Sequence, residues 1–330
     1  MINPDARLKD NLFEKPDMLP TRDGFGKALL ELGESNPNVV VLCADLAEST
    51  RVLPFKEKYP DRYIELGVAE QNLATVASGL ANYGKIPFIT SYATFSPGRN
   101  NEQIRTTIAI NNVPVKIAGS HAGLSVGPDG ATHQALEDMG LMRMLPNMTV
   151  ISPCDSEEAR KATLAAAAHP GPVYLRFGRA STPAMTTPDT PFEFGKAQLV
   201  WSSEHAAEVA VFATGPLLYQ ALCAAKELEH HIPVEVYNVH SVKPLDVEEL
   251  ADAAERAGAV VTVEEHQVAG GLGGAIAEVL AARCPVPVEF VGVKDSFGQS
   301  GEPAELIEHY GLGKSGILQA IQRVHTRKNL

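Results

Sequence analysis

Gly67-Val68-Ala69-Glu70-Gln71-Asn72 marks the point where a strand gives way to a helix. Residues 63–66 before it have the character of a short strand, and the apolar residues after it recur at i, i+3, i+4 and i+7 until Gly84. This pattern predicts a helix over residues 69–83 with Glu70 in its first turn. Ligands bind at the carboxyl ends of strands in open α/β sheets, so Glu70 is a candidate site residue. The helix dipole alone also favours an acid there, and both interpretations remain open.

Strand-length apolar runs alternate with helical segments on both sides of this stretch. After a polar arm over residues 1–20, strands are expected at 39–43, 63–66, 86–90, 113–119, 148–152 and 173–177, with helices after Thr21 and at 69–83, 98–111 and 155–168. The run at 39–43 is apolar throughout, as in a strand buried on both faces of a parallel sheet. Regular alternation of this kind predicts a doubly wound parallel sheet over residues 21–185.

A Pro- and Thr-rich segment precedes a second series of the same kind. It predicts a linker over residues 186–200. Strands then follow at about 208–213, 233–238, 259–264 and 287–292, separated by helices at 216–230, 246–257 and 272–283. Residues 201–330 are therefore expected to form a second, smaller α/β domain.

Composition excludes several classes of function. A formal net charge of −12, with no long Lys/Arg run, argues against nucleic-acid binding. The longest apolar stretch, 209–225, is broken by Gly215-Pro216, and the polar N-terminus resembles no signal peptide, so neither a membrane span nor secretion is expected. The widely spaced cysteines suit reduced thiols of a cytoplasmic protein; they are Cys43, Cys154, Cys223 and Cys284.

The loop at residues 120–133 follows a strand and carries two histidines, Asp129 and three glycines. Such a loop is typical of ligand binding. A zinc site is disfavoured, because His121 and His133 are twelve residues apart without cysteine partners. Either histidine alone could equally satisfy a local backbone group.

The glycine-rich segment at 269–276 also follows a strand and opens a helix. Its glycines do not fit the dinucleotide fingerprint, because Ile276 stands at the third position. Glu264 and Glu265 just before it would repel a pyrophosphate. A tight strand–helix packing turn is therefore expected.

Three motifs taken together resemble the pyrimidine-binding domain of transketolases: residues 67–72, Ser91-Tyr92-Ala93-Thr94-Phe95 and residues 127–134, Gly-Pro-Asp-Gly-Ala-Thr-His-Gln. Residues 263–266 and 270–273 are similar to the transketolase C-terminal domain, and the resemblance covers about residues 20–325. The Gly-Asp-Gly motif that holds the diphosphate and Mg²⁺ in transketolases is missing. The resemblance thus implies the C-terminal subunit of a split transketolase. A separate N-terminal partner subunit would carry the diphosphate-binding domain, and two copies of each chain would form a heterotetramer.

The resemblance assigns roles to individual residues. Glu70 would be the carboxyl that hydrogen-bonds N1′ of the aminopyrimidine of thiamine diphosphate. The remaining cofactor contacts would be Phe95, Tyr92 and Asp45. The substrate contacts would be His133, Asp129, Arg22, Ser49, His121 and Arg179, with His133 and His121 also counted as catalytic and Arg176 as a rival of Arg179 for the phosphate.

The activity so implied is transfer of a two-carbon ketol unit between sugar phosphates. Half of a 1-deoxyxylulose-5-phosphate synthase and the beta subunit of a 2-oxoacid dehydrogenase are alternatives. His121 and His133 favour transketolase, because sugar hydroxyls and phosphate need such donors. A cofactor-free regulatory binding module is the non-enzymatic alternative. The joint presence of four residues argues against it: Glu70, Phe95, Asp129 and His133.

Overall fold

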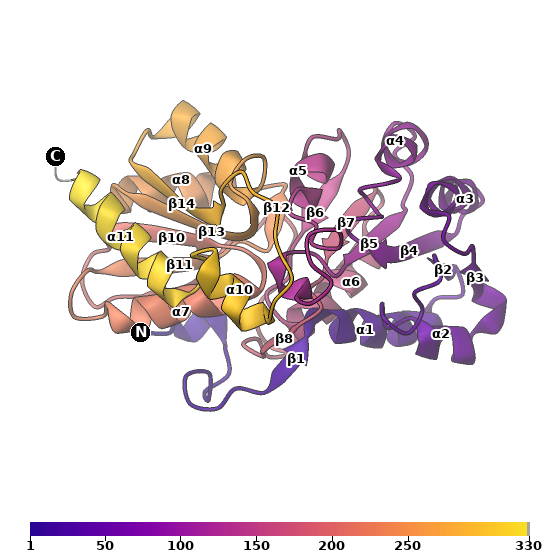
Figure 1. Cartoon of the computed structure of the whole chain (residues 1–330), viewed down its shortest axis with the longest axis horizontal. Coiled ribbons are helices and arrows are strands. Elements are labelled where there is room, and N and C mark those ends of the chain that lie inside the picture. Colours follow the sequence, from indigo (N-terminus) through magenta and orange to yellow (C-terminus); the bar gives the residue numbers. More distant parts are fainter. Residues whose placement is uncertain (329–330) are drawn as a thin grey trace.

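The computed structural model describes residues 1–328, which form two α/β domains (Figure 1). The larger sheet has seven strands in the order β12-β6-β7-β5-β4-β2-β3, all parallel except β12. Their bounds are β2 Val39–Cys43, β3 Tyr63–Glu65, β4 Ile86–Tyr92, β5 Lys116–Ser120, β6 Thr149–Ile151, β7 Val173–Arg176 and β12 Ser241–Lys243.

Helices cover both faces of this sheet because its central strands are apolar on both sides. On one face α1 (Thr21–Ser35) packs against α6 (Ser156–Ala168), while α2 (Leu53–Lys58) lies beside α1. On the other lie α3 (Glu70–Asn82), α5 (Asp138–Arg143), the single turn α4 (Asn101–Gln103) and a π-helix at Ile104–Ala109. The last two replace the single helix expected over 98–111. Asp155 caps α6 by accepting a hydrogen bond from the N–H of Glu158.

The smaller sheet has the order β14-β13-β10-β11-β9 and is parallel except for β9. Its strands are β9 Gln198–Ser202, β10 Val209–Ala213, β11 Val234–Asn238, β13 Val260–Gln267 and β14 Val288–Val293. Its helices are α7 Leu218–Glu227, α8 Val247–Ala257, α9 Leu272–Arg283, α10 Pro303–His309 and α11 Lys314–Lys328. The predicted fold class, a doubly wound parallel-sheet domain followed by a smaller α/β domain, is confirmed. Among residues 1–328 no helix combines the length and apolarity that a membrane span requires.

The glycine-rich segment before α9 is a packing turn. The Glu264 carboxylate accepts hydrogen bonds from the backbone N–H groups of Leu272 and Gly273, at 2.7 and 2.8 Å. A Cβ on Gly271 would lie 2.0 Å from Glu264 Oε2, which explains the glycine. The protein's own carboxylate thus occupies the helix N-terminus that a pyrophosphate would need.

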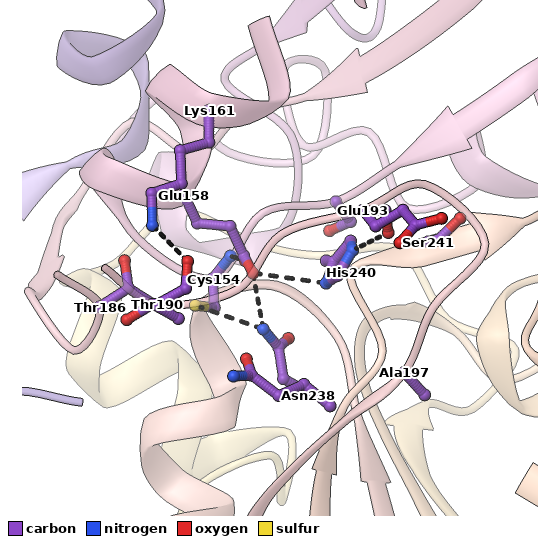
Figure 2. Close-up of polar contacts among 12 residues, drawn as sticks. Cys154, Glu158, Lys161, Thr186, Thr190, Glu193, Ala197, Asn238, His240 and Ser241 are labelled. Atoms are coloured by element: carbon purple, nitrogen blue, oxygen red, sulfur yellow. Dashed lines mark hydrogen bonds and ion pairs between the residues drawn. The ribbon is translucent and has the colours of Figure 1, made fainter. Parts of the chain in front are cut away.

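The two domains share one strand and a buried polar cluster. β12 comes from the second domain and completes the edge of the first sheet. β1 (Met18–Pro20) pairs with β8 (Ser181–Pro183) and joins the N-terminal arm to the end of the first domain. Residues 186–200, the predicted linker, connect the two domains, and β9 begins within that range, at Gln198. Figure 2 shows how Glu158 of α6 reaches the second domain: its carboxylate accepts a hydrogen bond from Asn238 at 2.7 Å and lies 3.4 Å from His240. Sequence patterns miss β12 because it is short and pairs antiparallel, far along the chain.

Candidate active site

Five parallel strands end at one edge of the larger sheet, and the polar residues that follow them gather there. Ser49 follows β2, Glu70 follows β3, Tyr92 ends β4, His121 follows β5 and Arg179 follows β7. Parallel strands direct their carboxyl ends to the same side, so loops that are far apart in sequence become neighbours.

Glu70 lies buried at the start of α3. Only 1% of its side chain is exposed; Oε1 accepts a hydrogen bond from Ser91 Oγ at 3.3 Å, and Oε2 pairs with Arg99 at 2.6 Å. The Asn100 side-chain amide donates to the Glu70 backbone carbonyl at 2.9 Å. Glu70 and Arg99 both line a pocket of about 400 Å³ at the beginning of α3. The sequence analysis misses Arg99, because the segment containing it has the pattern of an ordinary helix.

Aromatic rings extend the site from Glu70 towards the loop at residues 120–133. The rings of Tyr92 and Phe95 are stacked at 6.2 Å between centroids, and His133 meets the Phe95 ring edge-on at 5.5 Å. His121 stacks directly on Tyr92 at 3.9 Å. The four rings thus form one wall built from two loops, and edge-to-face and offset contacts of this kind hold rings in place.

Positive charge collects at the His121 end of this wall. Arg22 Nη1 lies 3.2 Å from His121 Nε2 and donates to the Ser49 carbonyl at 2.7 Å. Burial, and then repulsion from Arg51 and Arg179, lowers the pKa of the Arg22 guanidinium, so these cations are close enough to oppose one another. We call Arg22, Arg51, His121 and Arg179 the basic cluster. A metal ion at His121 is disfavoured because Nε2 faces a guanidinium.

His121 is held neutral in this environment. Burial, followed by repulsion from Arg22, Arg179 and Arg51, lowers its pKa to about 3. An anion bound among the arginines would offset their repulsion and raise that pKa. We therefore expect His121 to be neutral at pH 5 in phosphate-free buffer, and its pKa to rise when inorganic phosphate is added. Imidazole ¹⁵N chemical shifts measured against pH test this expectation; a His121 that titrates near 6.5 without phosphate would contradict it.

The same pKa has a consequence for stability. An unfolded histidine takes up a proton near pH 6.5, whereas His121 in the folded chain does so only near pH 3. Because the unfolded state then binds the extra proton, this group removes stability as pH falls from about 6.5 towards 3.

Arg176 belongs to a structural ion pair. Its side chain is 5% exposed and pairs with Asp138, whose Oδ2 accepts from Nε at 2.8 Å. Its other donors reach the carbonyl of Glu265 at 2.8 Å and that of Ala135 at 3.4 Å. With its donors engaged in the interior, Arg176 is not available to a phosphate, whereas Arg179 belongs to the basic cluster.

Two of the predicted site residues, Asp45 and Asp129, have exposed side chains, and among residues 1–328 neither side chain forms a hydrogen bond or ion pair with the four rings. Asp129 sits in the turn closed by the Gly130 N–H to Gly127 carbonyl hydrogen bond of 3.1 Å, and Asp45 has a left-handed backbone with φ of 59°. The Asp45 N–H donates to Glu65 Oε1 at 2.8 Å. Both follow strands of the same sheet edge, Asp45 after β2 and Asp129 in the loop after β5.

Comparisons with known proteins identify the family of both domains. Residues 17–185 match the family described as transketolase, pyrimidine binding domain, and residues 195–317 match transketolase, C-terminal domain. A 6-deoxy-6-sulfo-D-fructose transketolase subunit, SqwH, of Clostridium sp. (strain MSTE9) is 41% identical over 93% of this chain and 95% of that protein.

Two further proteins match along most of their length. An apulose-4-phosphate transketolase subunit of Phocaeicola vulgatus is 36% identical over 91% of this chain and 96% of that protein. A solved structure described as a split gene transketolase, inactive beta4 tetramer, superposes with a TM-score of 0.87 at 46% identity, covering 94% of this chain and 99% of that one.

Proposed function

Because this chain belongs to the transketolase family and contains its pyrimidine-binding and C-terminal domains, we propose that it is the C-terminal subunit of a two-subunit transketolase. The assembled enzyme transfers a two-carbon ketol unit between sugar phosphates with thiamine diphosphate. The observation that carries this proposal is a buried carboxyl, Glu70, next to the ring wall at the carboxyl edge of a parallel sheet.

The residues present suit the aminopyrimidine half of thiamine diphosphate. Phe95 and Tyr92 offer aromatic faces, and the Glu70 carboxyl lies in the protein interior, where it can hold a proton at N1′. When bound, the coenzyme supplies the stabilisation of carbanions that ketol transfer requires. Asp45 is assigned to the same cofactor on the resemblance alone.

The basic cluster and the two histidines suit the substrate. Arg22 and Arg179, with the neutral His121 and nearby Ser49, would bind the substrate's phosphate. His133, at the edge of Phe95, is assigned to the donor's hydroxyls and acid–base work, and Asp129 to the acceptor's α-hydroxyl.

The diphosphate and Mg²⁺ are assigned to a partner. The sequence lacks the Gly-Asp-Gly motif that binds them in transketolases, and two similar proteins are named as transketolase subunits. We therefore infer an N-terminal partner subunit and a heterotetramer with two copies of each chain. All four cysteines are unpaired, which fits a location in the cytoplasm.

Reconstitution with the partner subunit tests the proposal. We expect turnover of xylulose 5-phosphate with an aldose phosphate acceptor only when both chains and thiamine diphosphate are present. Turnover by this chain alone would exclude the split arrangement, and use of pyruvate as donor would favour a 1-deoxyxylulose-5-phosphate synthase. The SqwH relative's name makes 6-deoxy-6-sulfo-D-fructose a second donor to assay. Calorimetry that detects no thiamine diphosphate binding to the pair would favour a regulatory module.

The basic cluster can be tested at Arg179. This side chain is only half-buried, and it donates a hydrogen bond to the Val126 carbonyl in the loop at residues 120–133. In the assembled enzyme, Arg179→Met is expected to raise KM for the sugar phosphate by about tenfold or more, the usual loss for a charge-assisted hydrogen bond. Steady-state kinetics with phosphorylated and unphosphorylated donors provide the check. An equal change for both donors would mean that Arg179 does not contact the phosphate.

A further inference from the structure

Arg99 makes two contacts with the groups assigned to the coenzyme. Its Nη1 lies 2.6 Å from Glu70 Oε2, and its guanidinium carbon lies 4.7 Å from the centroid of the Phe95 ring. The guanidinium is therefore stacked on one aromatic face and hydrogen-bonded to one buried carboxylate at the same time. No other lysine or arginine among residues 1–328 touches either group.

An aminopyrimidine could make the same two contacts. A guanidinium is a flat, conjugated group that donates N–H bonds from its edge and stacks on aromatic rings. An aminopyrimidine protonated at N1′ is also flat and conjugated, and it would donate to Glu70 while stacking on Phe95. Both groups cannot occupy the same ring face and the same carboxylate oxygen.

The turn that carries Arg99 is fixed, but its side chain is free to leave. A Cβ on Gly98 would lie 2.0 Å from the Thr94 carbonyl, so only glycine permits this close turn. The Arg99 N–H donates to the Phe95 carbonyl at 3.0 Å, and Asn100 anchors the turn to Glu70 at 2.9 Å. The Arg99 side chain is nevertheless 46% exposed, so water is available to it.

Opening the contact with Arg99 is unfavourable for Glu70 unless another group replaces the guanidinium. The carboxyl is 1% exposed, and its remaining side-chain donor is Ser91 at the long distance of 3.3 Å. A buried carboxylate without a cation or a set of donors is unfavourable. Arg99 therefore keeps the chain stable while the coenzyme is away.

We propose that Arg99 masks Glu70 and Phe95 in the free chain and is displaced by the aminopyrimidine when the coenzyme binds. This inference rests on the proposed function, since it concerns regulation of the same site. The masked form must open before binding. The apparent affinity for the coenzyme is therefore the affinity of the open form multiplied by the fraction of chains that are open. The free chain is thereby protected from binding the coenzyme without its partner.

The test uses the full chain alone and 4-amino-5-hydroxymethyl-2-methylpyrimidine, the pyrimidine half of the coenzyme, which lacks the diphosphate. Arg99→Ala is expected to bind this probe about tenfold or more tightly than the unaltered chain, as measured by ligand-observed NMR. Arg99→Lys, which keeps the charge but loses the planar group, should lie between the two. Arg105→Ala is the matched control, because Arg105 is exposed in the adjacent π-helix.

Each result has a defined meaning. Unchanged or weaker probe binding by Arg99→Ala would overturn the mask, and weaker binding would instead make Arg99 a contact of the pyrimidine. The double variant Arg99→Ala with Glu70→Gln should not bind the probe more tightly than the unaltered chain, because the Glu70 carboxyl that accepts the probe's hydrogen bond is gone. Thermal unfolding shows whether Arg99→Ala is folded, and Arg99→Lys keeps the test valid if it is not. In the assembled enzyme KM for thiamine diphosphate should fall; absence of turnover by the unaltered pair would count against the proposed function itself.

Discussion

Glu70→Gln is expected to lower turnover of the assembled enzyme by about a hundredfold or more, the range found when a positioned acid–base group is lost. Glutamine keeps the shape of the side chain and can still accept or donate a hydrogen bond. It cannot hold and release a proton at N1′, which is the task assigned to this buried carboxyl. Glu70→Ala should lose at least as much, because it removes the contact to Ser91 as well.

The measurement is ketol transfer by the variant chain mixed with the partner subunit at saturating thiamine diphosphate. Glu57→Gln is the matched control, since Glu57 is an exposed carboxylate on α2. Saturating coenzyme matters because Glu70→Gln also removes the ion pair with Arg99, and a binding defect has to be separated from a chemical one. Near-normal turnover would remove Glu70 from the mechanism.

Arg176→Met is expected to lower the free energy of unfolding by about 3–5 kcal/mol, the usual result when one partner of a buried ion pair is removed. Asp138 is 1% exposed and would keep only the hydroxyl of Tyr174, at 2.6 Å, as a side-chain donor. Burial raises the pKa of Asp138, but Arg176 and its hydrogen bonds outweigh burial and hold that pKa below its usual value. The variant also loses the hydrogen bond to the Glu265 carbonyl in the second domain.

Urea unfolding followed by circular dichroism measures this effect. Arg256→Gln is the control, because Arg256 is 53% exposed in its ion pair with Glu235 and such surface pairs contribute about 1 kcal/mol or less. The double variant Arg176→Met with Asp138→Leu should recover much of the loss, since a buried pair can be replaced by apolar residues of similar size. Equal losses for Arg176→Met and Arg256→Gln would contradict this account.

Sequence patterns predict the site wherever a residue directly follows a strand. Glu70 stands out because the strand and helix periods meet beside it, and His121 because it lies in the loop that follows a strand. Arg179 is singled out only by the family resemblance. Arg99 escapes prediction for a physical reason: its contacts depend on a close turn at Gly98, which no periodicity records. Sequence alone does not decide between Arg176 and Arg179, because it does not define where β7 ends and its loop begins.

The exchange of β12 constrains where this polypeptide can be divided. Because Ser241–Lys243 supplies the outermost strand of the first sheet, separating the chain between residues 185 and 240 would strip β6 of its outer neighbour. The N–H and C=O groups on that side of β6 would then be open to pairing with other chains, which is a route to aggregation. If the two domains were separate polypeptides, the second would still have to supply β12 to the sheet of the first. A division ahead of the first domain leaves both sheets intact.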